Sequence, residues 1–119
     1  MPKTKARKLP KVVEVIVEAG ESKQAENIMV LDVSKTSPVV DYLVILSAES
    51  EPQVRAIEKE IDKQLRSNKI KGFRWQGVAK SGWIGLDLGD ILVHIMRAEE
   101  RAYYNLEELW ENDAVTYHY

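Results

Sequence analysis

The chain of 119 residues contains no cysteine, so a disulfide framework and a thiolate metal site are both excluded. It also has no apolar run approaching the ~18 residues that a transmembrane helix requires. Its first ten residues are basic but lead into no apolar segment, which argues against a secretory signal. We therefore expect a cytoplasmic protein with a single domain, long enough to bury its own core.

The net charge of −2 argues against a dedicated nucleic-acid-binding protein, whose affinity comes largely from neutralising phosphates. The charge is nevertheless uneven along the chain. Residues 1–11 carry five basic side chains and no acidic one, whereas residues 98–113 carry six acidic side chains and one basic one. An acidic end favours a basic partner such as another protein. The alternative is that these charges only form solvated faces.

Hydrophobic spacing and turn residues predict an α/β domain. Helices are expected over residues 9–20, 51–67 and 98–110, the last broken near Asn105, and strands over residues 28–33, 41–47 and 73–78 and in a hairpin over residues 83–96. The helix at 51–67 joins two strands, which predicts a right-handed crossover that leaves them parallel. This order of elements predicts a mixed five-stranded sheet with flanking helices.

The hairpin is the most informative segment, because Gly89-Asp90 separates two apolar runs. Glycine at the first position of a two-residue loop predicts a type II′ turn, which needs φ > 0 there. This turn fixes the register and therefore the two faces of the hairpin. The apolar face, which we expect to be buried, pairs Ile84, Leu86 and Leu88 with Ile95, Val93 and Ile91. The mixed face pairs Trp83, Gly85 and Asp87 with Met96, His94 and Leu92.

The mixed face offers candidate catalytic groups but no complete catalytic set. Asp87 and Asp90 point in different directions, whereas general acid–base catalysis needs both groups aimed at one reacting atom. Asp87 and His94 share a face, and such a pair orients an imidazole, but no activated nucleophile accompanies it. The alternative for His94 is a structural histidine. His118 has no metal-ligand spacing with His94, so we expect no metal site. Because none of these groups forms a complete catalytic set, we also expect no catalytic residue and no cofactor.

Trp83 has two interpretations. It packs beneath the C-terminal helix as part of the core, or it lies partly exposed at the centre of an interface, where large aromatic side chains dominate the binding energy. Physical reasoning from the residues alone therefore predicts a small α/β binding domain without an active site.

The chain resembles the ribosomal silencing factor family, known as RsfS or Iojap. The residues that carry this resemblance are Trp83, Leu86–Asp90, Val93–Met96, Arg101, Tyr104, Leu106, Glu107, Leu109 and Trp110, and upstream Leu31–Val33, Asp41–Ile45, Gln53, Val54 and Ile57. The resemblance covers residues 9–111. Residues 1–8 are then a basic flexible arm, and residues 112–119 a C-terminal tail.

This resemblance implies a nucleotidyltransferase-like fold that has lost its catalytic residues. It also implies a translational repressor that binds a basic protein of the large ribosomal subunit, the fourteenth in that series, on the inter-subunit face. Binding there would block association with the small subunit. The docking surface would include Trp83, Asp87, Leu88 and Asp90, with His94 supporting the same sheet face.

Two alternatives and one additional contact stay open at this point. A nucleotide-handling enzyme of the same fold would respond to nucleotides with Mg²⁺. A self-associating scaffold would form a homodimer through the apolar side chains of the mixed face. The basic arm would add a weak, salt-dependent contact with ribosomal RNA. No membrane partner is expected.

Overall fold

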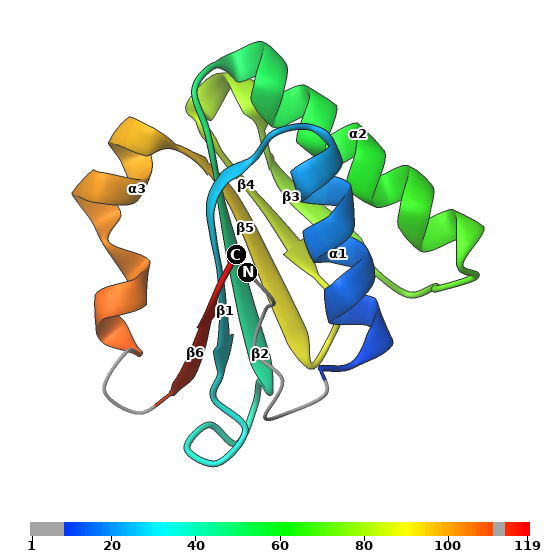
Figure 1. Ribbon diagram of the computed structural model, residues 1–119, viewed down its shortest axis with the longest axis vertical. Helices are drawn as coiled ribbons and strands as arrows, with labels where there is room; N and C mark the ends of the chain where they lie inside the picture. Colours follow the sequence, from blue (N-terminus) through cyan, green and yellow to red (C-terminus); the bar gives the residue numbers. More distant parts are fainter. Residues whose placement is uncertain (1–8, 111–113) are drawn as a thin grey trace.

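Six strands form one mixed sheet at the centre of the molecule (Figure 1). The computed structural model describes residues 9–110 and 114–119. The elements are α1 (Lys11–Ser22), β1 (Glu26–Asp32), β2 (Tyr42–Ala48), α2 (Glu51–Ser67), β3 (Arg74–Val78), the 3₁₀ turn η1 (Ala79–Ser81), β4 (Trp83–Asp87), β5 (Ile91–Arg97), α3 (Ala98–Tyr104), the 3₁₀ turn η2 (Leu106–Leu109) and β6 (Val115–His118). The strand order is β3-β4-β5-β2-β1-β6, with β2 and β5 parallel and all other neighbours antiparallel.

The α/β class is confirmed, but the predicted number of five strands is wrong. The sixth strand, β6, lies within residues 112–119, which were expected to be a tail. It pairs with the outer edge of β1, where Tyr117 lies opposite Val30 and is buried. The strand is only four residues long, and its partner lies at the other end of the sequence. The expected basic arm, residues 1–8, lies outside the described residues.

The prediction for the crossover through α2 was correct in that the two strands it joins, β2 and β3, run parallel. These strands are not neighbours in the sheet, however. β3 is antiparallel to β4, β4 is antiparallel to β5, and β5 is parallel to β2, so β2 and β3 run in the same direction. They do not pair with each other, because β4 and β5 lie between them. The parallel neighbour of β2 is β5, the second arm of the hairpin.

Helix α2 shows how local sequence sets this fold. The Ser50 hydroxyl accepts a hydrogen bond from the Gln53 backbone N–H at 3.3 Å, and proline occupies the first turn, so the helix begins where the sequence indicates. Its apolar stripe is fully buried and consists of Val54, Ile57, Ile61 and Leu65. Helices α1 and α2 lie over one face of the sheet (Figure 1), and the stripe packs into the core between them and the strands.

The other face of the sheet is covered only in part. Over β1, β2 and the end of β5, a second apolar cluster packs beneath Leu106 of η2 and Trp110, the residue that follows it; the cluster consists of Met29, Leu31, Val33, Leu43, Ile45 and Met96. Over β3 and β4 the described residues provide no such cover. Arg74, Gln76 and Val78 are exposed, and Trp83, Gly85 and Asp87 opposite them are half-buried. We call these six residues, with Leu92 and His94 of β5, the open sheet face.

Candidate functional site: an open sheet face beside an acidic, aromatic cavity

The predicted hairpin is confirmed in register and in the burial of its apolar face. Leu86 lies opposite Val93 and Gly85 opposite His94, and Gly89 adopts φ +92°. The Leu88 backbone N–H donates to the Ile91 carbonyl at 2.9 Å, which closes the turn. The apolar face is buried against α1 and α2 through Ile84, Leu86, Ile91, Val93 and Ile95. The mixed face therefore belongs to the open sheet face, except for Met96, which is fully buried in the second apolar cluster.

Trp83 is held in one orientation by two neighbours. Its indole Nε1–H donates to His94 Nδ1 at 3.0 Å, and its ring centroid lies 4.8 Å from that of Tyr104 on α3. The side chain packs against the second apolar cluster but stays only half-buried. Both interpretations of Trp83 are therefore partly realised, because one part of the ring supports α3 and the rest faces outward.

His94 is paired with Trp83 and not with Asp87. An indole N–H can only donate, so Nδ1 must accept and the imidazole is neutral with its proton on Nε2. Burial lowers the pKa of His94 below its ordinary value of 6.5, which keeps the ring in this neutral form. A catalytic base oriented by a carboxylate is not formed. The imidazole instead positions the indole.

The two aspartates lie at the turn end of the hairpin. Asp87 accepts a hydrogen bond from the Gly89 backbone N–H at 2.8 Å and has the Arg74 guanidinium at 3.8 Å. The Asp90 side chain is exposed, and its backbone carbonyl accepts from the Asp41 N–H at 2.8 Å. Asp87 and Asp90 thus place two carboxylates at one rim of the open sheet face, without a shared reacting position.

The Leu88 side chain lies on the opposite face of the sheet from Trp83, Asp87 and His94. It is half-buried and packs against the cluster beneath α1 and α2. Strand parity predicts this placement. Of the five residues expected at the docking surface, Trp83, Asp87 and His94 share the open sheet face, whereas Leu88 and Asp90 lie at the turn.

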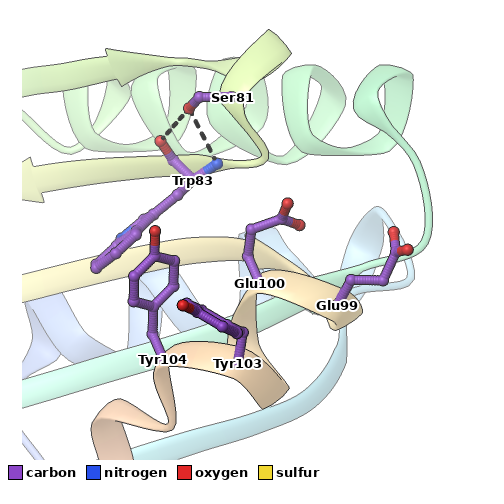
Figure 2. A pocket seen from close by; sticks show the side chains of 6 residues that line it. All are labelled: Ser81, Trp83, Glu99, Glu100, Tyr103 and Tyr104. Atoms are coloured by element: carbon purple, nitrogen blue, oxygen red, sulfur yellow. Dashed lines mark hydrogen bonds between the residues drawn. The ribbon is translucent and has the colours of Figure 1, made fainter.

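A cavity beside Trp83 was not predicted from the sequence. It has a volume of about 520 Å³ and is lined by Ser81, Trp83, Glu99, Glu100, Tyr103 and Tyr104 (Figure 2). The side chains come from η1, the first residue of β4 and helix α3. A sequence signal existed in the acidic and aromatic composition of residues 99–104, but only the packing of α3 against β5 brings these residues to Trp83.

Helix α3 is fixed to the sheet by Arg101, which is buried. Its Nε donates to Glu107 at 3.0 Å, and its Nη1 donates to the Ser47 hydroxyl at 2.7 Å and to the Asn27 carbonyl. These contacts join α3, η2, β1 and β2. They explain why this helix contains an arginine, and they hold α3, which forms one wall of the cavity, against the sheet.

The described residues carry no group of three or more histidine, aspartate or glutamate side chains that could hold a metal ion. Within the same part of the chain, no helix is long and apolar enough to cross a membrane. The arrangement provides a surface and a cavity for binding.

Comparisons with known proteins agree with this architecture. The family described as "Ribosomal silencing factor during starvation" (RsfS) matches residues 6–118. The ribosomal silencing factor RsfS of Bacillus subtilis is 39% identical over 99 residues, covering 83% of this chain and 84% of that protein. A crystal structure from Bacillus halodurans is 36% identical with a TM-score of 0.75 and covers 88% of this chain and 96% of its own. A crystal structure from Chromobacterium violaceum has a TM-score of 0.82 at 26% identity and covers 88% of both chains.

Fold and comparisons thus define a small mixed α/β domain of a regulatory class. The chain belongs to the ribosomal silencing factor (RsfS) family. This membership assigns it to ribosome-associated regulators of translation and not to enzymes.

Proposed function

We propose that this protein represses translation by binding the large ribosomal subunit through its open sheet face. The partner on the subunit is the fourteenth protein of the large-subunit series, on the inter-subunit face. A protein bound there occupies the space that the small subunit needs, so repression is steric and requires no turnover. The protein would act in the cytoplasm, where free subunits join.

The observation that carries this proposal is the half-buried indole of Trp83, which contacts Tyr104 of α3 at the edge of the open sheet face and is held there in one orientation. Large aromatic side chains at the centre of a surface contribute most of the binding energy in protein interfaces. Hydrogen bonding to His94 reduces the entropy that Trp83 loses on binding, because the side chain already has one orientation.

Charge supports a basic partner. Asp87 and Asp90 form an acidic rim at the turn end of the open sheet face, and α3 with its following turn adds Glu99, Glu100 and Glu108. Complementary charge accelerates association and sets the register of two surfaces. The basic ribosomal protein implied by the family resemblance matches this sign.

The direct test is co-sedimentation of the protein with isolated large subunits. We expect Trp83→Ala to weaken binding by on the order of 30-fold or more, since truncating a central aromatic costs about 2–4 kcal/mol. Asp87→Lys should weaken it as well by reversing the rim charge. Glu18→Lys is the matched control, because Glu18 is exposed on α1 behind the sheet and makes the same charge change.

Circular dichroism should be nearly unchanged in all three variants. Wild-type protein should also reduce the fraction of joined particles when small subunits are added to the mixture. Unchanged joining at saturating protein, or equal binding by Asp87→Lys and Glu18→Lys, would contradict the proposal. Loss of the folded spectrum in Trp83→Ala would assign the indole to the core.

Two further interactions belong to this proposal. Residues 1–8 carry four basic side chains, and we propose that they bind ribosomal RNA weakly. Removing these residues should then flatten the salt dependence of subunit binding by roughly 0.7–0.9 in log–log slope for each phosphate group that the arm neutralises. The apolar members of the open sheet face also permit a homodimer, and light scattering of wild type and Trp83→Ala tests whether the indole holds it together.

A further inference from the structure

We infer that the cavity beside Trp83 is a receptor for a cationic side chain, an arginine supplied by the protein that covers the open sheet face. This inference rests on the proposed function, because that partner delivers the side chain. It adds a second recognition element, formed by α3 and η1, to the docking surface on the sheet. The cavity and the open sheet face share Trp83.

The aromatic wall of the cavity suits a flat cation. The Trp83 and Tyr104 ring centroids are 4.8 Å apart with planes at 49°, and those of Tyr103 and Tyr104 are 4.9 Å apart at 89°. Tyr103 is 81% exposed and Tyr104 50% exposed, so neither ring is required to fill the core. A guanidinium placed over such faces gains a cation–π attraction.

Two carboxylates form the acidic wall of the cavity: Glu99 has a hydrogen-bond donor, whereas one oxygen of Glu100 has none. Glu99 accepts a hydrogen bond from the Arg97 guanidinium at 2.8 Å. Glu100 Oε1 is buried and has no hydrogen-bond partner among the described residues. Figure 2 shows the aromatic rings on one side of Glu100 and the Glu99 side chain on the other. A carboxylate with a buried oxygen and no donor is unfavourable, and Glu100 also lines the cavity, so a cation that enters would compensate the charge of this carboxylate.

The backbone is shaped around Glu100. Gly82 adopts φ +82°, and a Cβ atom at this position would lie 2.7 Å from Glu100 Cδ and 2.8 Å from Oε1. The carboxylate therefore occupies space that exists only because residue 82 has no side chain. Ser81 is already satisfied, since its hydroxyl donates to the Val78 carbonyl at 2.7 Å. Glu100 is thus the group on which a ligand would act.

Arginine fits this combination better than the other common side chains. Its planar guanidinium can stack on an aromatic ring and donate to a carboxylate at the same time, whereas a lysine ammonium is a point charge. An apolar side chain would leave Glu100 Oε1 unpaired, and an acidic one would be repelled. A partner seated on the open sheet face brings its own side chains to the cavity rim, because Trp83 belongs to both.

The inference can be tested with capped arginine (N-acetyl-arginine amide) as the probe and capped citrulline, its neutral analogue, as the control. Titration is followed by the NMR signal of the Trp83 indole N–H. We expect a saturable shift with capped arginine only. Glu100→Gln should weaken binding on the order of tenfold by removing the charge-assisted hydrogen bond, and Glu99→Gln should change it less than about twofold.

Co-sedimentation with large subunits provides the second measurement. Glu100→Gln and Tyr103→Ala should both bind more weakly than Glu99→Gln, with unchanged circular dichroism. Tyr103→Ala keeps the test valid if Glu100→Gln disturbs the packing around Gly82, because Tyr103 is exposed.

Two results would overturn the inference. In the first, capped arginine and capped citrulline give the same response. In the second, both cavity variants bind subunits like wild type while Trp83→Ala and Asp87→Lys do not, which would leave the proposed function intact. If wild-type protein fails to sediment with large subunits, the proposed function itself fails.

Discussion

Replacing Arg101 by methionine tests whether one buried side chain fixes α3 to the sheet. Arg101 is 8% exposed and donates hydrogen bonds to Glu107, Ser47 and the Asn27 carbonyl. Methionine fills a similar volume but donates nothing. The variant therefore leaves a carboxylate, a hydroxyl and a carbonyl group without their donor in a region where the Glu107 side chain is only 16% exposed.

The expected loss of stability is large. Removing one partner of a buried ion pair destabilises a protein by roughly 3–5 kcal/mol, because the remaining charge is left uncompensated. A domain of this kind has a total free energy of unfolding of about 5–15 kcal/mol. The melting temperature should therefore fall by roughly 10–20 °C, since each kcal/mol corresponds to several degrees in a chain of this length.

Urea unfolding followed by far-UV circular dichroism measures the change. Arg55→Met is the matched control, because Arg55 is 59% exposed and pairs with Glu51 on the surface of α2. Such a pair contributes about 0.3–0.5 kcal/mol. The double variant Arg101→Met/Glu107→Leu should recover at least half of the lost stability, since both charges are then removed. A loss below about 1 kcal/mol for Arg101→Met would refute this reasoning.

Three further changes test separate features. Burial lowers the pKa of His94, so wild-type stability should fall as pH drops below 6.5 towards the folded-state pKa. His94→Asn keeps an acceptor for Trp83 without a titrating group, and its urea midpoint should depend less on pH in this window. Gly82→Ala should cost about 1–2 kcal/mol in thermal unfolding through its positive φ, and should also weaken arginine binding by displacing Glu100. Tyr117→Ala should cost about 3 kcal/mol in urea unfolding, and no change would mean that β6 is dispensable.

The features that the sequence predicted are those set by neighbours along the chain. The Gly89-Asp90 turn fixed the hairpin register, and hydrophobic spacing predicted α2 over residues 51–67, where the structure has it. The break near Asn105 was also predicted. The structure confirms it, since Asn105 adopts φ +48° and ends α3. Each of these depends on backbone preferences and spacing within a few residues.

The candidate site was predicted only in part. Parity along β4 and β5 placed Trp83, Asp87 and His94 on one face, and that placement is confirmed. The hydrogen bond from Trp83 to His94 was not predicted, because the direction of an indole depends on the packing of its neighbours. Parity also placed the Leu88 side chain on the apolar face, and the structure confirms this, with Leu88 half-buried there; its place in the docking surface stays a prediction.

Sequence alone thus determined the first five strands and the helices, the hairpin and the polarity of its two faces. Tertiary structure decided the pairing of β2 with β5, the addition of β6 and the position of α3 beside Trp83. Arg101 illustrates the difference, since it lies 74 residues from Asn27 in the chain and donates to its carbonyl. Contacts of this range depend on how complete elements pack together, and no local periodicity or turn preference specifies them.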